Sequence, residues 1–180
     1  MNWADVRNEL LVRTPVAPAE LASVTQTGVY AWYDKEGALV PFYPSDFPPV
    51  DRSLPLYVGL AAKDSLAGRV VGTHMVSTRR SGLRRSLAAL LHEELDLRPG
   101  VIAHPKGKFD LMPTRETKLT DWMLDNGLRV TWVTHDAPVL VEKLIIRNLL
   151  SPLNYTHATG SPYRASMRRL RVELRTAALN

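Results

Sequence analysis

The fold of this sequence is limited most by the order in which strand-like and helix-like segments follow one another. Residues 27–33 and 56–60 have the composition of β-strands, residues 38–40 follow a turn signal and are expected to form a further strand, and residues 128–134 are the last strand segment. Helical patterns lie between and after them. Strands, then helices, one more strand and final helices predict an α+β fold around a small, mainly antiparallel sheet.

Helical patterns cover most of the remaining chain. The strongest is a row of leucines from Leu83 to Leu95, whose spacing of three and four residues is that of an amphipathic helix. The other expected helices span residues 5–13, 18–24, 63–71, 114–126, 138–150 (entered through Asp136) and 163–178. Helices are therefore expected at both ends of the chain.

Size and composition favour a single domain over residues 1–180. The 180 residues contain no internal repeat, and a hydrophobic share of 45% is enough to bury a core without disulfide or metal. The absence of cysteine excludes thiol nucleophiles and thiolate metal sites, so any metal must be bound by oxygen or imidazole. Because no segment approaches the ~18 apolar residues of a membrane span, we expect a soluble, cytoplasmic protein.

Positive charge is concentrated in two segments. The net charge is +5, and 17 of the 23 basic residues are arginine, whose planar guanidinium can bind a phosphate in two places. Six basic residues against one acidic lie within 63–85, and five against one follow residue 160. The arginines expected to contact nucleic acid are Arg79, Arg80, Arg84, Arg85, Arg164, Arg168, Arg171 and Arg175. A solvated surface explains such groups equally well.

Two strand segments place a tyrosine beside a glycine. Because side chains alternate along a strand, Gly28, Tyr30 and Trp32 share one face, as do Tyr57 and Gly59 in the next strand. Space opens beside each phenol, where a ligand or another backbone can approach. The alternative is two buried tyrosines that only form local hydrogen bonds.

The position of Glu142 in the expected helix 138–150 is unusual for a carboxylate. On a helical wheel Lys143 and Arg147 form the exposed stripe, whereas Glu142 lies with Ile145 and Ile146 on the inner side. Desolvation of an ionised carboxylate in such a place costs on the order of several kcal/mol, unless a cation or hydrogen-bond donors contact it. A structural salt bridge and a carboxylate that binds Mg²⁺ in a cleft both meet this requirement.

Taken in order, these residues resemble the motifs of the GIY-YIG nucleases. Gly28-Val29-Tyr30 is followed by Tyr57-Val58-Gly59, by Arg69 with His74 behind it, by Glu142 and by Ser151-Pro152-Leu153-Asn154. The ordered set extends from Gly28 to Asn154 and is more specific than any one motif. The helix that carries Glu142, followed by Pro-Leu-Asn, contributes most to this specificity.

The resemblance implies a three-stranded, mainly antiparallel sheet flanked by helices and the metal-dependent hydrolysis of a phosphodiester bond in double-stranded DNA. Tyr30 would then activate or position the attacking water. Tyr57 would line the site and contact the phosphate, and Arg69 would stabilise the charge of the transition state. The rest of the sequence leaves no room for a separate DNA-binding domain, which favours a restriction-type or defence nuclease over a homing enzyme with a long recognition tail. A relaxed nuclease, or one directed by a partner, stays open.

Three further roles follow from the same resemblance. Glu142 would bind one divalent ion, Mg²⁺ or Mn²⁺. Asn154 would fix the local structure around the site, and His74 would assist proton transfer.

Two stretches depart from the minimal family pattern. Tyr30 and Tyr57 are 27 residues apart, so residues 41–55 are interpreted as an insertion, and a second insertion covers about 75–127. Arg69 and His74 are five residues apart instead of the four that keep two side chains on one helix face. We expect Gly72 to end the helix before His74.

The main alternative is a non-catalytic DNA-binding module that retains this fold. In that case Tyr30, Arg69 and Glu142 should lie far apart, or neighbouring side chains should fill the space between them. Glu116-Thr117-Lys118, with Asp110, superficially resembles another nuclease motif, but it opens an expected helix and not a strand. The oligomeric state is open between a monomer and a homodimer.

Overall fold

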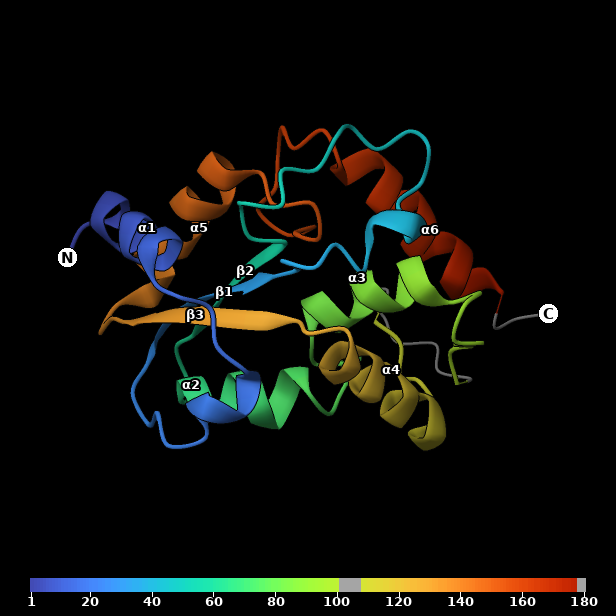
Figure 1. Cartoon of the computed structure of the whole chain (residues 1–180), viewed down its shortest axis with the longest axis horizontal. Coiled ribbons are helices and arrows are strands. Elements are labelled where there is room, and N and C mark those ends of the chain that lie inside the picture. The colour runs from blue at the N-terminus through green and yellow to red at the C-terminus, as the bar shows by residue number, and fades with distance from the viewer. Residues whose placement is uncertain (101–107, 178–180) are drawn as a thin grey trace.

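A three-stranded antiparallel sheet with strand order β2-β1-β3 forms the centre of the fold (Figure 1). The strands are β1 (Gly28–Tyr33), β2 (Tyr57–Ala61) and β3 (Arg129–Thr134). The computed structural model describes residues 1–100 and 108–177. The predicted α+β class and small antiparallel sheet are confirmed.

Helices surround the sheet on both faces and at one end. They are α1 (Trp3–Val12), α2 (Leu66–Arg69), α3 (Gly82–Leu91), α4 (Pro113–Asp125), α5 (Pro138–Leu149) and α6 (Arg164–Thr176). Shorter helical turns are the 3₁₀ turns η1 (Pro18–Leu21) and η2 (Val40–Phe42) and the π turn η3 (Val70–His74). Residues 101–107 of the second predicted insertion, and residue 178 of the last predicted helix, lie outside the described residues.

The sheet separates two hydrophobic cores. In Figure 1 α1 and α5 lie on one face of the sheet, α2 lies on the other, and α3, α4 and α6 lie beyond one end. Val29, Ala31 and Val58 point into the core under α1 and α5. Tyr30 and Trp32, which alternate with them along β1, point into the larger core on the opposite side. None of the helices described is both apolar and long enough to span a lipid bilayer.

Residues 38–40 do not form the predicted strand. The carboxylate of Asp34 accepts hydrogen bonds from the backbone nitrogens of Gly37, Ala38 and Leu39 at 2.8, 2.9 and 2.8 Å. A strand would need those donors for its ladder, and Gly37 has a φ of +79°. The segment therefore forms a tight turn that leads into η2, and this prediction was wrong.

Gly72 does not end the helix, contrary to prediction. The chain continues from α2 into the π turn η3, which contains Gly72 and ends at His74. A π turn is built on a spacing of five residues, so side chains five apart can lie on one side. Arg69 and His74 consequently both reach Tyr30, and the step of five is accommodated by the backbone.

Gly59 leaves the room that Tyr30 occupies on the sheet. The two residues are direct partners in the β1–β2 ladder. A Cβ atom added at Gly59 would lie 2.6 Å from Cζ of Tyr30, far closer than two carbon atoms can approach. The space predicted beside this glycine is thus filled by the tyrosine of the neighbouring strand.

We predict that Gly59→Ala lowers the free energy of unfolding by about 1–3 kcal/mol, because Tyr30 must be displaced. Gly72→Ala is the matched control, since nothing lies within 4 Å of its added Cβ, and its expected change is within about 0.5 kcal/mol. Urea denaturation of both variants measures the difference. A Gly59→Ala protein as stable as the wild type would contradict the packing of Tyr30 against β2.

Candidate active site

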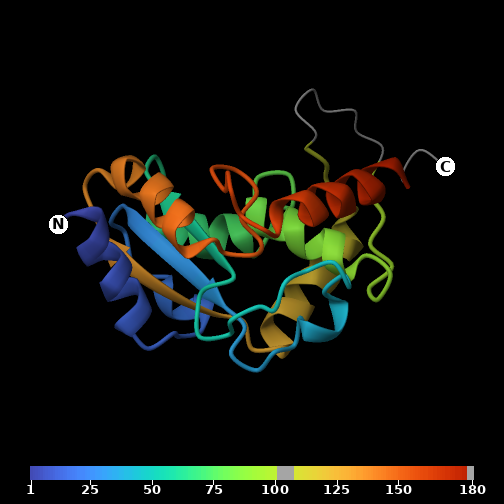
Figure 2. The same ribbon diagram turned by 90° about the horizontal axis from the view of Figure 1, so that it is seen from above.

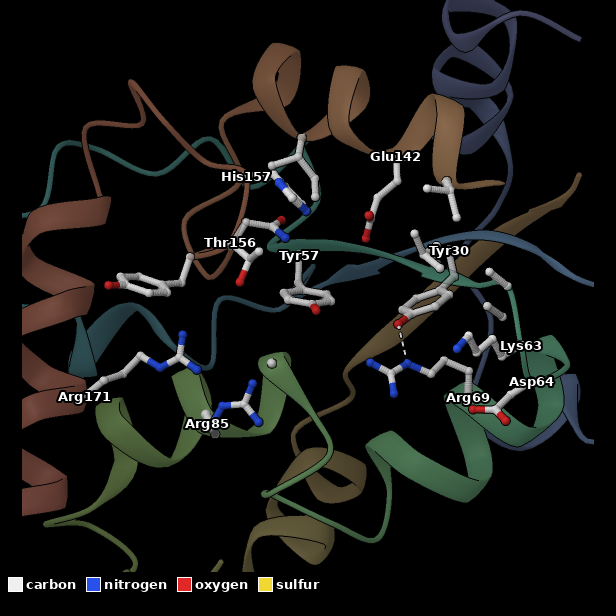
Figure 3. A pocket seen from close by; sticks show the side chains of 18 residues that line it. Tyr30, Tyr57, Lys63, Asp64, Arg69, Arg85, Glu142, Thr156, His157 and Arg171 are labelled. Atoms are coloured by element: carbon white, nitrogen blue, oxygen red, sulfur yellow. Dashed lines mark hydrogen bonds between the residues drawn. The ribbon is translucent and has the colours of Figure 1, made fainter. Parts of the chain in front are cut away.

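A cleft of about 450 Å³ brings together residues from six elements of the fold (Figure 3). It is lined by five of the six predicted catalytic residues, namely Tyr30, Tyr57, Arg69, Glu142 and Asn154. These residues are distant in the sequence, and the space among them is open. The sixth, His74, lies behind Tyr30 and is fully buried.

The hydroxyl of Tyr30 is held between two nitrogen groups. Its oxygen lies 2.5 Å from Nε2 of His74, and it accepts a long hydrogen bond of 3.4 Å from Nε of Arg69 (Figure 3). The other ring nitrogen of His74, Nδ1, lies 2.6 Å from Oγ of Ser81. Burial raises the pKa of Tyr30, and burial together with the nearby Arg69 lowers the pKa of His74 well below its usual range. Both groups are therefore neutral at pH 7.

The buried hydroxyl of Ser81 lies against the second ring nitrogen of His74, Nδ1. Ser81 precedes α3, and its Oγ accepts the amide hydrogen of Arg84 at 3.0 Å. Among the described residues, the one acceptor for the hydroxyl hydrogen of Ser81 is Nδ1 of His74. Leaving that hydrogen without an acceptor would cost about 1–3 kcal/mol. The hydroxyl hydrogen of the equally buried Tyr30 meets the same requirement at Nε2, so the neutral imidazole, which has one acceptor nitrogen, accepts from one of the two hydroxyls and donates to the other.

Tyr57 lies in the middle of the cleft floor. Its hydroxyl is close to the first residue of α3, because a Cβ at Gly82 would be 2.9 Å from that oxygen. Burial raises the pKa of Tyr57, an effect that the guanidinium groups of Arg69, Arg85 and Arg171 partly oppose. Tyr57 thus stands within the field of several cations.

Glu142 projects from α5 into the cleft without a countercharge (Figure 3). Within the described part of the chain, no cationic nitrogen lies within 4 Å of its carboxylate, so the structural salt bridge considered from the sequence is not formed there. Burial raises the pKa of Glu142 to about 7, and Arg69 partly opposes this shift. The carboxylate is available to a cation.

The site fits a divalent cation that takes few protein ligands. Residues 1–100 and 108–177 contain no group of three or more acidic or histidine side chains placed to bind a metal. Mg²⁺ commonly binds through one or two carboxylates together with water and substrate phosphates. A single uncompensated carboxylate beside Arg69 is compatible with that mode, and Glu142 is the residue that would hold the ion.

Asn154 holds the outer edge of β2. Its Oδ1 accepts from the backbone nitrogen of Val58 and its Nδ2 donates to the carbonyl of Val58, both at 2.8 Å. The adjacent Leu153 donates its backbone N–H to the carbonyl of Leu56 at 2.9 Å. These contacts fix β2, and with it Tyr57, beside the loop that follows α5.

Arg84 does not contact DNA, which corrects the prediction for this residue. Its side chain is fully buried, and Nη2 lies 2.6 Å from Oε2 of Glu116. It also donates to the carbonyl of His74 at 3.2 Å and to the hydroxyl of Thr120 at 2.9 Å. Arg84 therefore joins α3 to α4 and supports His74 from behind, and Glu116 is engaged in the same ion pair.

The other predicted arginines face outward or line the cleft. Arg85 and Arg171 are half-buried in the cleft wall, and the exposed ones are Arg79, Arg80, Arg164, Arg168 and Arg175. The guanidinium groups of Arg164 and Arg171 lie 5.1 and 5.0 Å from the ring centre of Tyr155.

Four residues of the site were not predicted from the sequence: Ser81, which contacts His74, and the loop residues Tyr155, Thr156 and His157, which line the cleft. Ser81 carried a usable signal, because a serine before an apolar helical pattern is a typical N-cap. The loop residues carried none beyond their position after Asn154.

Comparison with known proteins identifies one family. The family model described as the GIY-YIG catalytic domain matches residues 28–173. No curated protein and no solved structure matches the chain. The match covers both predicted insertions and most of α6 as well as the motif residues.

The raised pKa of Glu142 predicts a pH-dependent stability in the absence of divalent metal. Its folded-state pKa of about 7 lies above the ordinary value of 4.5, so the folded protein binds this proton more tightly than the unfolded chain. The contribution is fully present below pH 4.5 and is lost as the pH rises through 7. Glu142→Gln should raise the free energy of unfolding at pH 8 by about 1–3 kcal/mol and change it little at pH 4.5.

Urea denaturation in EDTA at the two pH values measures this effect. Glu94→Gln alters an exposed carboxylate outside the cleft and is expected to leave stability unchanged at both. A Glu142→Gln protein that gains nothing at pH 8 would show that the carboxylate is well solvated.

Proposed function

Because the chain belongs to the GIY-YIG catalytic-domain family, we propose that it is a metal-dependent endonuclease that hydrolyses phosphodiester bonds in double-stranded DNA. Membership of the family supports the general statement that this is a nuclease domain that acts on DNA. Dependence on a metal ion is supported by the environment of Glu142, whose carboxylate has no countercharge and shares an open cleft with Arg69 and two tyrosines.

The cleft offers the groups that phosphodiester hydrolysis needs. The reaction requires a positioned water, neutralisation of charge on the phosphate oxygens and stabilisation of the leaving oxygen. The guanidinium of Arg69 neutralises the phosphate, and Tyr57 donates a hydrogen bond to one of its oxygens. Glu142 would hold Mg²⁺ or Mn²⁺, which supplies positive charge that stabilises the transition state when bound.

Tyr30 is the group that positions and activates the water. In the resting site its hydroxyl keeps its proton, because burial raises its pKa. Its hydroxyl donates to Nε2 of His74, which takes up the proton, and Arg69 donates to the oxygen and stabilises the phenolate that forms. The phenolate then accepts a proton from the attacking water. In this scheme His74 assists proton transfer as the base that receives the hydroxyl proton of Tyr30.

We further propose a restriction-type or defence nuclease. Arg85 and Arg171, which line the cleft, both lie within the matched catalytic domain. The contacts to DNA and the cleaving groups therefore belong to one domain. DNA bound by the wild type without cleavage in Mg²⁺ or Mn²⁺ would instead indicate the non-catalytic module.

We predict that Glu142→Ala reduces Mg²⁺-dependent cleavage of plasmid DNA by about 10²-fold or more, while the affinity for DNA in EDTA changes little. The variant lacks the carboxylate that would hold the metal and keeps the arginines. Gel analysis of plasmid products and a filter-binding titration measure the two effects, with Glu94→Gln as the active control. Equal cleavage by wild type and Glu142→Ala would refute this role.

We also predict that the double variant Arg168→Ala, Arg171→Ala flattens the slope of log affinity against log salt by up to about two. Both side chains lie on α6, and fewer phosphate contacts release fewer counterions. Arg169→Ala is the matched control, because Arg169 is paired with Asp46 at 3.0 Å. An unchanged slope in the double variant would remove α6 from the DNA interface.

A further inference from the structure

The catalytic cleft continues past Tyr57 into a second hollow of about 440 Å³. Its charged and aromatic lining consists of Arg85, Lys108, Tyr155, Arg168, Arg171 and Arg175, and none of the described residues that line it is acidic. Arg85, Arg171 and Tyr155 border both hollows. The two hollows therefore form one groove that begins at Glu142 and ends between α3 and α6.

Arg85 and Arg171 form the junction of this groove. Helix α6 packs against α3, and Figure 2 shows the two helices side by side. In Figure 3 the two guanidinium groups project into the same space, on the far side of Tyr57 from Tyr30. Nη1 of Arg85 donates to the carbonyls of Thr78 and Arg79, at 3.1 and 2.6 Å, so its head group is fixed.

These two cations lack the carboxylate partners that neighbouring arginines have. Arg84 is paired with Glu116, and Arg169 is paired with Asp46 and Glu173. No carboxylate of the described residues lies within 4 Å of Arg85 or Arg171. Burial and the nearby Arg85 lower the pKa of Arg171 to about 10, so an anion placed between the two would relieve their repulsion.

The groove is asymmetric about the catalytic residues. At the end opposite Arg171 lie Lys63 and Asp64, whose opposite charges cancel (Figure 3). The excess of positive charge lies on one side of Tyr57. A DNA strand laid along the groove meets cations on that side of the reacting phosphate and a nearly neutral surface on the other.

We propose that Arg85 and Arg171 bind one phosphodiester group of the cleaved strand other than the one that is hydrolysed, and that the backbone is thus gripped on one side of the cut. The inference rests on the proposed function and adds to it a second phosphate subsite and a direction. A guanidinium pair suits this ligand, because each can donate two hydrogen bonds to phosphate oxygens. The enzyme then needs phosphates on one flank of the scissile bond and tolerates their loss on the other.

Methylphosphonate substitution tests this subsite directly. In a duplex whose cleavage position has been mapped, single phosphates on each flank are replaced by uncharged methylphosphonates, and single-turnover cleavage is measured. For the wild type we expect a loss of about tenfold at one or two positions on one flank, and less than about twofold at all positions of the other flank.

Variants connect the sensitive phosphate to the arginine pair. In Arg171→Gln unmodified DNA is cleaved more slowly, and the sensitive position loses most of its effect because its partner is already absent. Arg171→Lys, which keeps the charge, should retain part of the sensitivity at that position. Arg169→Gln, on the same helix, should show the wild-type pattern.

The outcomes separate this proposal from the proposed function. Cleavage with equal sensitivity on both flanks, or full sensitivity retained in folded Arg171→Gln, would overturn the subsite and leave the nuclease activity intact. If the wild type does not cleave with Mg²⁺ or Mn²⁺, the proposed function fails. Duplexes with a single methylphosphonate at each position in turn are then compared by affinity in EDTA. There Arg171→Gln must lose the response of the wild type to at least one substituted phosphate, or the subsite fails too.

Discussion

The hydrogen bond between the hydroxyl of Tyr30 and Nε2 of His74 joins the middle of the sheet to the helices at its end. His74 in turn contacts Ser81, whose oxygen caps α3, and Arg84 of α3 reaches both the carbonyl of His74 and the carboxylate of Glu116 on α4. Tyr30, His74, Ser81 and Arg84 are buried, and Glu116 at the end of the series is partly buried. Because a polar group left unsatisfied in such a place is costly, the network favours one arrangement of β1, η3, α3 and α4.

Consecutive residues of α3 have opposite roles in this arrangement. Arg84 points inward and is neutralised by Glu116, whereas Arg85 points into the cleft and has no carboxylate partner within the described residues. The segment that the minimal family pattern left unexplained thus supports Tyr30 from behind and forms one wall of the cleft. The family match through this segment agrees with its place in the site.

Much of this molecule could be predicted from its sequence where one local rule decides the outcome. The spacing of the leucines located α3, the helical wheel put Glu142 on the inner side of α5, and the order of short motifs indicated which residues would converge. Contacts between distant residues could not be read in this way. The engagement of Arg84 with Glu116 depends on how α4 packs on α3, and the turn at residues 37–39 depends on Asp34 accepting the donors of a strand. The π turn that aligns Arg69 with His74 has no compositional signal, and Gly72 led to the wrong prediction that the helix ends before His74.

The grip of Asn154 on Val58 has an additional consequence for the behaviour of the chain in concentrated solution. β2 is an edge strand, and edge strands present unpaired backbone groups that can recruit a strand from another molecule. At Val58 both groups are occupied by one amide side chain that imitates a neighbouring strand, and Leu153 occupies the carbonyl of Leu56. The residue that steadies Tyr57 therefore also leaves no backbone group of Val58 free to pair with a strand of another molecule.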